Sequence, residues 1–263
     1  MKGQKTLNVA PILEFILPVV LVCVWWLASS NSASFYFPPL KEILITFQES
    51  WLSQRFMQDL VPSLLRLFAG FALAVVVGVS AGMLFGLRRS LNEVVSAVLD
   101  FLRSMPSVAL IPLAILIFGI GASMKIFVIA FGALWPILLN TIDGVRGTDA
   151  QLIDVAKSFR LSRYERLTKI ILPAASPQIF TGLRASLSIS VIMMVVSEML
   201  ASTDGIGFAI LQAQRSFAIK EMWAGIIVLG IVGYLLNVLF ILIERKVMHW
   251  HVNMRGLGNA VSS

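Results

Sequence analysis

Long apolar runs without charge dominate the pattern of hydrophobic and polar positions along this chain. Five stretches contain no Asp, Glu, Lys or Arg, namely 15–40, 67–87, 104–124, 126–142 and 222–243. A helix that crosses a membrane needs roughly 20 mainly apolar residues, and several of these runs meet that length. The pattern therefore predicts an integral membrane protein, which we assign to the all-α class.

Six membrane spans fit the pattern, at about 9–28, 60–87, 94–118, 125–140, 179–200 and 222–243. Pro106 and Pro112 interrupt the third of them. Residues 31–52 predict an outer loop and an amphipathic helix at the membrane interface, with aromatic side chains at headgroup depth. We divide the chain into an N-terminal part with the first span and the interfacial helix (1–59), a transmembrane domain (60–246) and a cytoplasmic tail (247–263).

Charge is scarce in this chain and unevenly placed. Of 263 residues, 58% are hydrophobic and 13% charged, whereas ordinary soluble domains are about 25% charged. With the N-terminus inside, 13 Lys and Arg residues fall on the inner side of the six spans and 5 on the outer side. Because inner loops carry the basic excess, both termini and the segment 150–173 are predicted to be cytoplasmic. The net charge of +7 has the same origin and does not indicate a nucleic-acid partner.

The segment 150–173 has more order than a plain solvated loop requires. Four apolar residues recur at helical spacing and give a first short helix an apolar stripe, namely Leu152, Val155, Ala156 and Phe159. Ser162 followed by Glu165 is a capping-box signature, so a second helix is predicted to begin at about Arg163. Pro173 and Pro177 mark the transition into the fifth span. A solvated loop would explain the charges, whereas the stripe fits a cleft on another protein.

The same segment resembles the signature loop of bacterial ABC-transporter permeases of the binding-protein-dependent import type. In that pattern Glu-Ala-Ala is followed after three further residues by glycine, and later by isoleucine and Leu-Pro. The matching positions here are Asp154, Val155, Ala156, Arg160, Ile170, Leu172 and Pro173. Arg160 replaces the glycine, which takes a left-handed turn that costs other residues about 1–2 kcal/mol. The capping box at Ser162 indicates that the turn is kept.

Further stretches extend the resemblance over about 60–246, among them "LRSMPSVALIPLAILIFGIG", "PQIFTGLRASL" and "SEMLASTDGIGFAI". They are similar to the branch that contains sulfonate, taurine, nitrate and bicarbonate permeases. The resemblance implies the transmembrane subunit of an ATP-driven importer of the type I class, which forms the pathway for a small solute. A sulfonate-like anion is the solute that this branch favours, and a neutral heterocycle or aromatic compound is the alternative.

In that family the signature loop is a coupling helix that docks on a separate ATP-hydrolysing subunit. The contact residues that the resemblance implies here are Asp154, Val155, Ala156, Phe159, Arg160, Leu161, Ser162 and Arg163. The chain contains no G-x-x-x-x-G-K-[ST] phosphate loop, so we expect no cofactor in it, and ATP with Mg²⁺ on the partner. The other implied partners are a second ATPase copy, an extracytoplasmic solute-binding protein and a second permease copy in the bacterial inner membrane.

Polar residues inside spans are costly and often functional, and they supply the candidates for the solute pathway. Arg103 and Arg184 are candidates for attracting an anion, although both also suit a position at the inner headgroups with the charge in water. Met193 is a candidate pore-lining residue, with ordinary helix packing as the alternative.

At the outer side, Glu198 ends the fifth span and is the fourth pathway candidate. Arg215 and Lys220 are possible partners for its carboxylate, and exposure to water is the alternative. Arg66 lies at the outer end of the second span, where we expect an interface. Residues 203–208, "TDGIGF", predict a tight outer loop over the pathway or a simple turn.

Two other classes of protein compete with the permease interpretation. The first, an intramembrane enzyme, is disfavoured because the only histidines, His249 and His251, follow the last span and no Ser–His or paired aspartate arrangement is visible inside the spans. We also expect no metal site. A self-contained secondary transporter or channel is disfavoured because the chain shows no internal repeat and no acid pairs inside the spans. We therefore predict a non-enzymatic subunit that depends on a partner for energy.

Overall fold

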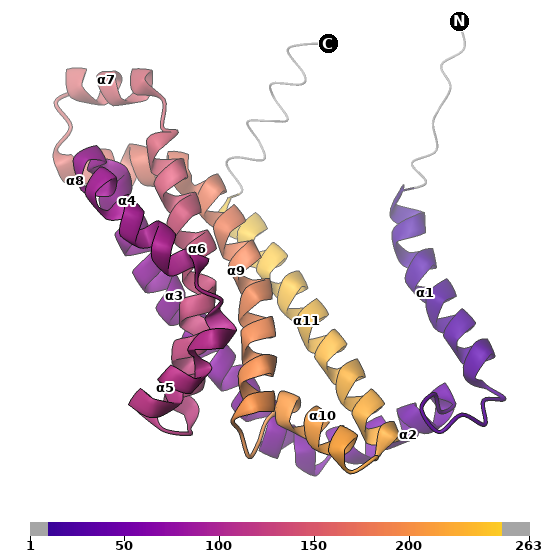
Figure 1. Ribbon diagram of the computed structural model, residues 1–263. Helices are drawn as coiled ribbons and strands as arrows, with labels where there is room; N and C mark the ends of the chain where they lie inside the picture. Colours follow the sequence, from indigo (N-terminus) through magenta and orange to yellow (C-terminus); the bar gives the residue numbers. More distant parts are fainter. Residues whose placement is uncertain (1–9, 249–263) are drawn as a thin grey trace, which may run out of the picture.

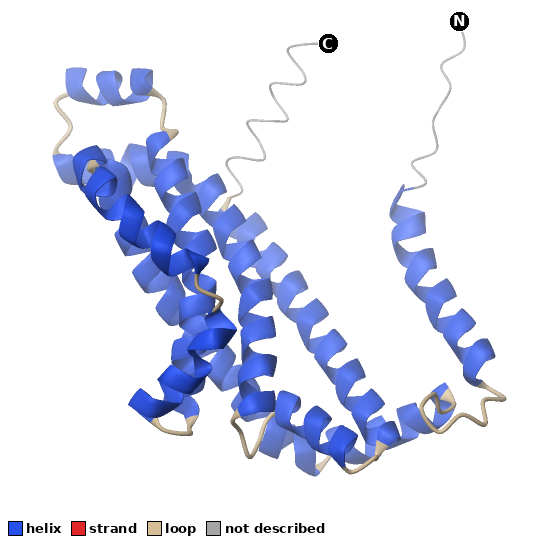
Figure 2. Ribbon diagram, in the orientation of Figure 1, coloured by secondary structure: helices blue, strands red, loops and turns tan. Residues whose placement is uncertain are grey.

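The computed structural model describes residues 10–248, and every regular element in this part of the chain is a helix (Figure 2). In chain order these are α1 (Ala10–Ser29), α2 (Leu40–Trp51), η1 (Phe56–Leu60), α3 (Val61–Leu87), α4 (Arg89–Ser104), η2 (Ser107–Leu110), α5 (Ile111–Phe118), α6 (Ala122–Arg146), α7 (Ala150–Ser158), α8 (Arg163–Arg166), η3 (Leu167–Ile171), α9 (Leu172–Leu200), α10 (Ile206–Arg215) and α11 (Ile219–Val247). The all-α class is confirmed. Both termini, and nearly all of the predicted tail with His249 and His251, lie outside the described residues.

The centre of the molecule is formed by α3, α6 and α9, with α6 packed against both of the others (Figure 1). Helix α11 contacts α9, α10 and α2, and α1 stands apart from the central helices beyond α11 (Figure 1). Helix α7 marks one end of the molecule and α10 lies at the opposite end (Figure 1). We call these the α7 end and the α10 end. The start of α1 and the end of α11 point toward the α7 end (Figure 1).

Four helices in the described part of the chain are long and apolar enough to cross a membrane, namely Phe56–Leu87, Ala122–Arg146, Arg163–Leu200 and Ile219–Val247. They correspond to the second, fourth, fifth and sixth predicted spans. The first predicted span falls on α1, which contributes a shorter apolar helix, Ile16–Ser29. The third is not one continuous helix.

The third predicted span, 94–118, is interrupted as its prolines indicated, and the interruption is a sharp bend. The helix stops at Ser104, and the segments Ser90–Ser104 and Ser107–Phe118 are bent by 85° relative to each other. Pro106 explains the break, because proline lacks the backbone N–H and disfavours the helical conformation for the preceding residue. Met105 accordingly has an extended backbone, with ψ of 123°. The two segments make at most one span between them.

The predicted interfacial helix is present as α2. Its buried residues Leu40, Ile43 and Trp51 lie on one face, and the helix packs against α11. Glu42 on α2 also forms an ion pair with Lys220 on α11, with 2.7 Å between Oε2 and Nζ. Helix α2 is thus fixed to the last span by apolar packing and by a surface charge pair.

Small residues bring α3 and α6 into close contact. Gly70, Ala74, Gly78 and Gly82 recur every four residues and are all buried. A Cβ atom added at Gly82 would lie 2.5 Å from Cβ of Thr141 on α6, closer than any real contact. In a membrane, where lipid is as apolar as the side chains, helices associate largely by such close van der Waals packing. The spacing of four therefore determines which face of α3 meets α6.

Gly82→Ala should destabilise the chain, because the added methyl group has no room against Thr141. Overpacking of this kind costs about 1–3 kcal/mol, and the midpoint of thermal unfolding of the detergent-solubilised protein should fall. The matched control is Gly230→Ala on α11, where no heavy atom lies within 4 Å of the added Cβ. That change should keep or raise the midpoint, since alanine is more favourable than glycine inside a helix by about 1 kcal/mol of free energy. Equal midpoints for the two variants would contradict the packing.

Candidate functional site

The α7 end carries the segment that resembles a coupling helix, and its turns are closed by specific hydrogen bonds. Asp149 caps α7, because its side chain accepts a hydrogen bond of 2.8 Å from the backbone N–H of Gln151. At the other end of α7, Arg160 has a left-handed backbone with φ of +54°. Its N–H donates to the carbonyl of Lys157 at 2.9 Å, and the N–H of Leu161 donates to the carbonyl of Ala156 at 3.0 Å. This is a Schellman motif.

The turn at Arg160 therefore survives without glycine, as the sequence predicted. The capping box that supports it is also confirmed, since Ser162 Oγ accepts from the Glu165 N–H at 3.2 Å and the Ser162 N–H donates to the Glu165 carboxylate at 3.1 Å. Arg160 keeps a conformation that is unfavourable for a side chain because both flanking helices are closed by hydrogen bonds. The result is a defined helix–turn–helix.

The second helix of this segment continues directly into the fifth span. From Arg163 to Leu200 the backbone is one helix of 38 residues, in which α8 and α9 are joined by the π-helical turn η3. Pro173 lies in the first turn of α9, and Pro177 lies inside it. The expected transition at these prolines is thus a change of helix type without a break. We call Arg163–Leu200 the α8–α9 rod, and it connects the α7 end to the α10 end.

The apolar stripe of α7 lies mostly in the open. Leu152, Val155 and Phe159 are exposed, and Phe159 is 76% exposed. Ala156 differs from them, because it is only 1% exposed within its own chain. The expectation that Ala156 contributes contact surface is therefore corrected, and its small side chain instead lets α7 seat against the rest of the segment.

The remaining predicted contact residues surround the stripe. Asp154, Arg160, Ser162 and Arg163 are exposed, and Leu161 is half-buried. Asp154 is paired with Lys157 on the same helix, with 2.8 Å between Oδ1 and Nζ. The segment thus presents an apolar stripe with a charged border, and no other described element covers it.

At the α10 end the structure assembles a cluster of charged side chains and serines from η1, α3, α6, α9 and the loop after α9. We call it the α10-end cluster, and its members are Asp59, Ser63, Arg66, Lys125, Glu198, Ser202 and Asp204. Glu198 at the end of the α8–α9 rod is 0% exposed. Its carboxylate accepts hydrogen bonds from Ser63 Oγ at 2.7 Å and from an Arg66 guanidinium nitrogen at 3.2 Å, both on α3.

The predicted partners of Glu198, Arg215 and Lys220, were wrong. Lys220 pairs with Glu42, and the cation beside Glu198 is Arg66. Arg66 does mark an interface, one between helices of the same chain. The sequence does not indicate this pair, because Arg66 and Glu198 are 132 positions apart. Only the packing of α3 against α9 brings them together.

The short loop after the rod is held by the second half of the cluster. Asp204 accepts a hydrogen bond of 2.6 Å from Arg66, and its other oxygen lies 3.7 Å from Lys125 Nζ. Lys125, at the start of α6, donates to Ser202 Oγ at 2.5 Å. Partial burial alone would raise the pKa of Asp204, but the hydrogen bond and the charge of Arg66 outweigh burial and hold this pKa below its usual value.

Three successive N–H groups at the start of α10, beginning with its N-cap residue, donate to side chains of the cluster. Those of Gly205, Ile206 and Gly207 donate to Asp59, Ser63 and Glu198 at 2.9, 2.9 and 3.0 Å. Two carboxylates at a helix N-terminus also interact favourably with the helix dipole. Gly205 has φ of +112°, and a Cβ there would lie 2.4 Å from the Glu198 carboxyl carbon. Gly205, the first glycine in "TDGIGF", is therefore required for the approach of Glu198 to α10.

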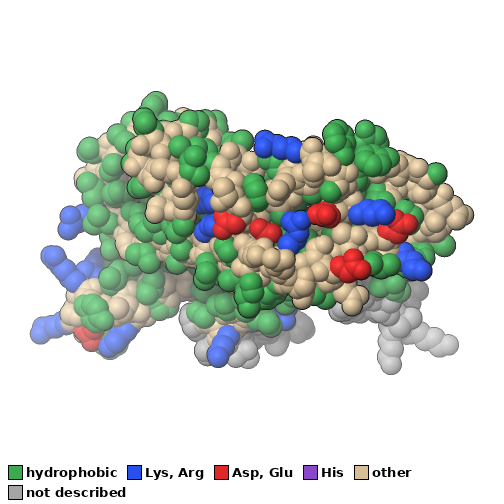
Figure 3. Space-filling model, turned by 90° about the horizontal axis from the view of Figure 1, so that it is seen from below, with side chains coloured by type: hydrophobic (Ala, Val, Ile, Leu, Met, Phe, Trp, Pro, Cys, Tyr) green, Lys and Arg blue, Asp and Glu red, His purple; other side chains and the backbone are tan. Residues whose placement is uncertain are grey.

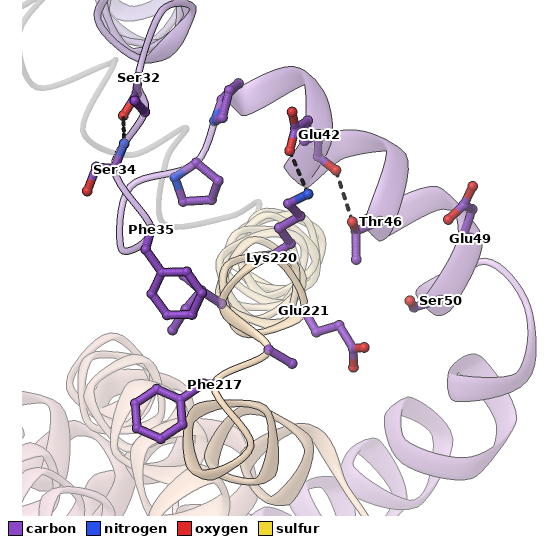
Figure 4. Close-up of a pocket in the computed structure, with 15 residues that line it drawn as sticks. Ser32, Ser34, Phe35, Glu42, Thr46, Glu49, Ser50, Phe217, Lys220 and Glu221 are labelled. Carbon is purple, nitrogen blue, oxygen red and sulfur yellow. Dashed lines mark hydrogen bonds and ion pairs between the residues drawn. The ribbon is translucent and has the colours of Figure 1, made fainter.

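Acidic and basic side chains alternate in a row across the face of the molecule at the α10 end (Figure 3). Among the hollows at this end of the described chain, two are lined by several charged side chains. A polar hollow of about 660 Å³ adjoins the α10-end cluster and is lined by Gln54, Arg55, Gln58, Asp59, Thr203, Asp204, Phe208 and Gln212. A second, of about 580 Å³, lies between the loop 32–39, α2 and the α10–α11 turn, where Lys220 reaches Glu42 (Figure 4).

The other predicted pathway residues are not brought together. Arg103 on α4 forms an ion pair with Asp100 at 3.0 Å. Arg184 on α9 forms an ion pair with Glu244 on α11. Met193 is buried in the helix core, where a Cβ added at Gly132 would lie 2.8 Å from its Cγ. Within one chain Arg184 joins α9 to α11 and Met193 packs against α6, whereas the partner of Arg103 lies on its own helix, so the three form no common site.

No group of three or more His, Cys, Asp or Glu side chains in the described part of the chain is arranged to hold a metal ion. The chemistry of both ends is therefore that of hydrogen bonds, ion pairs and apolar contact.

Comparison with known proteins finds relatives over most of the chain. A family model described as "Binding-protein-dependent transport system inner membrane component" matches residues 74–248. The putative aliphatic sulfonates transport permease protein SsuC of Bacillus subtilis is 34% identical over 243 residues, which cover 92% of this chain and 88% of that protein. The bicarbonate transport system permease protein CmpB of Synechococcus elongatus is 33% identical over 253 residues, covering 92% and 89%.

Among solved structures, the fold is similar to a chain of the MetNI methionine ABC transporter in an inward-facing conformation. The TM-score is 0.61 at 22% sequence identity, and the match covers 72% of this chain and 94% of that chain. This likeness supports the helical architecture described above.

Arg160→Gly should stabilise the turn between α7 and α8, whereas Arg160→Val should destabilise it. Glycine adopts a positive φ without steric cost, while a β-branched residue there is a strong outlier. We expect the two variants to differ by about 1–2 kcal/mol in local stability. Hydrogen exchange of the α7 amides measures this, and equal protection in both variants would contradict the left-handed turn.

Arg66→Gln should strongly destabilise the chain, because it leaves the carboxylate of Glu198 buried without its cation. Breaking a buried ion pair costs about 3–5 kcal/mol, which should appear as a large fall in the thermal midpoint in detergent. Lys220→Gln is the control, since it breaks the exposed pair with Glu42, and exposed pairs contribute only about 0–1 kcal/mol. Similar losses in both variants would show that the cluster is not the structural anchor of the α10 end.

Proposed function

This chain belongs to the family of binding-protein-dependent transport system inner membrane components, and from this premise we propose that it is driven by a separate ATP-hydrolysing subunit and imports a small anion. The family establishes an ABC-importer permease, and the relatives described above are named as transport permeases. The energy source, the solute and the other partners are the parts that we propose. ATP and Mg²⁺ would bind to the partner.

The observation that carries the proposal is the exposed apolar stripe on α7. Leu152, Val155 and Phe159 face away from their own chain, although α7 is joined to well-packed helices on both sides. Apolar side chains that are bordered by charges and left uncovered suit a protein contact, in which the buried apolar part supplies most of the affinity and the charged rim fixes orientation. We infer that a groove on the ATPase subunit covers this stripe.

The α8–α9 rod gives the contact a route to the rest of the molecule. The docked segment is joined to α9 by continuous helix from Arg163 to Leu200, so a displacement of the segment is transmitted to α9 without a flexible loop between them. Helix α9 packs against α6 along its length. Movement of two ATPase subunits would thus move the helical core of each permease copy and alternate access between the two sides.

For the solute we propose a small anion of the sulfonate type. The two relatives described above carry aliphatic sulfonates and bicarbonate in their names, and both solutes present an anionic oxygen group. A neutral heterocycle or aromatic compound is the alternative solute. A self-contained transporter is the alternative class of protein. We also propose a solute-binding protein that docks at the α10 end, a second copy of this chain, and a bacterial inner-membrane location with both termini in the cytoplasm.

Phe159→Arg should abolish coupling, because a charge in the middle of the stripe cannot be buried in a partner groove. In the complex reconstituted with its ATPase subunit, we expect at least tenfold weaker co-purification of that subunit and loss of solute-stimulated ATP hydrolysis. Phe35→Arg is the control, since Phe35 is an exposed aromatic residue at the α10 end and its substitution should leave co-purification unchanged.

Two results would contradict the proposed function. The first is unchanged binding and stimulation of the ATPase subunit in Phe159→Arg, which would show that the stripe on α7 is not the docking surface. The second is accumulation of solute by the purified chain alone in ATP-free liposomes, which would favour the self-contained transporter.

A further inference from the structure

The charges of the α10-end cluster are layered by depth. The side chain of Asp204 is 36% exposed, while those of Arg66 and Lys125 are only 11% and 3% exposed. Both cations face Asp204, and Thr203 and Asp204 line the polar hollow of about 660 Å³. Asp204 therefore stands between the open hollow and two buried cations.

The charge balance of these groups shows what Asp204 contributes. Arg66 and Lys125 carry two positive charges, and Glu198 and Asp204 carry two negative charges. Glu198 is fixed from several sides, by Ser63, Arg66 and the N–H of Gly207. With Asp204 removed from the cations, one positive charge is left without compensation, and a single external monoanion would restore neutrality.

Asp204 differs from the other charged members of the cluster in the position of its backbone. It lies on the short loop 201–205, outside any helix, whereas Arg66, Lys125 and Glu198 lie on α3, α6 and α9. Its carboxylate is held by Arg66 at 2.6 Å and by Ser202 Oγ at 3.1 Å. Guanidinium groups bind the oxygens of carboxylates and of other oxyanions with the same planar fork of donors.

We propose that Asp204 is an internal substitute for the anionic group of the solute. A sulfonate or similar oxyanion that enters the hollow replaces the Asp204 carboxylate on Arg66 and Lys125, and the loop 201–205 then moves away from α3 and α6. The exchange of one anion for another keeps the buried charge balanced throughout. It also keeps the solute from binding too tightly to dissociate, because the returning Asp204 carboxylate displaces it from the two cations. This inference rests on the proposed import of an anion.

The test uses the permease complex with its ATPase subunits in lipid nanodiscs and methanesulfonate as the probe. Asp204→Asn removes the internal competitor, so the affinity for methanesulfonate measured by calorimetry should rise at least tenfold. The double variant Asp204→Asn with Lys125→Gln should lose that gain, because the uncompensated charge is gone.

Asp59→Asn is the matched control. Asp59 lines the same hollow, but it contacts Arg55 and the N–H of Gly205 rather than Arg66 or Lys125. If the rise came only from removing negative charge near the hollow, both Asp→Asn variants would bind methanesulfonate more tightly. The proposal requires that only Asp204→Asn does so. An unchanged affinity in Asp204→Asn, or an equal rise in Asp59→Asn, overturns it.

A second measurement does not depend on removing the charge. In a Cys23→Ser background, Thr203→Cys reports on the loop 201–205 through its rate of reaction with an impermeant maleimide. Methanesulfonate should raise this rate several-fold, whereas methanesulfonamide, an uncharged analogue of similar shape, should leave it unchanged. A rate that does not respond to methanesulfonate, or responds equally to both compounds, overturns the proposal.

Uptake by the same complex reconstituted in liposomes distinguishes failure of this proposal from failure of the proposed function. If the complex imports a sulfonate with ATP, but Asp204→Asn has no effect on sulfonate binding, the exchange at Asp204 is wrong and the proposed function stands. If the complex imports a neutral solute with ATP and imports no sulfonate, the proposed anionic solute is wrong, and the exchange at Asp204 is wrong with it.

Discussion

The close approach of α6 to α3 and α9 is the contact on which the rest of the structure depends. On one side, Gly82 meets Thr141; on the other, a Cβ at Gly182 would lie 2.6 Å from the carbonyl oxygen of Pro136. Glycines at both contacts let the backbones come nearer than other residues allow. Because apolar burial gains little between helices in lipid, this close packing and a few interhelical hydrogen bonds hold the core together. One such bond joins Ser186 of α9 to the carbonyl of Ala133 at 2.6 Å.

The packing of α9 against α6 gives the two ends of the molecule a physical connection. The α8–α9 rod begins in the capping box at Ser162 and ends beside Glu198, which is buried against α3 and the start of α10. A shift of the rod at the α7 end therefore acts on a carboxylate whose hydrogen bonds have fixed geometry. A buried charge does not adjust by small amounts, because losing its partners is costly.

The two ends serve different kinds of contact. At the α7 end, apolar side chains are exposed on a helix whose turns are closed by its own hydrogen bonds, so a partner finds a surface that is already formed. At the α10 end, charges are buried and satisfied within the chain, and what faces outward is a polar hollow. A lasting contact with a protein suits the first, and reversible recognition of a small charged group suits the second.

By itself the sequence determined the features that depend on neighbouring residues. The uncharged runs specified the apolar helices, Ser162 and Glu165 specified a capping box, and the spacing from Asp154 to Pro173 specified the family signature. These follow from local hydrogen bonding and from the length of a membrane span. The interruption of the third span also had a local signal in Pro106, whereas the angle of the bend did not.

Tertiary structure decided the features that depend on distant residues meeting. Glu198 was visible as an acid at the end of the fifth span, yet its burial and its pairing with Arg66 arise only because α3 and α9 pack side by side. Ala156 belonged to the apolar stripe by spacing, and only the fold showed that it faces its own chain while Phe159 faces outward. The α10-end cluster draws charges from α3, α6, α9 and the loop after it, and sequence alone cannot assemble it because the interaction energy of charges depends on distance and burial, not on order along the chain.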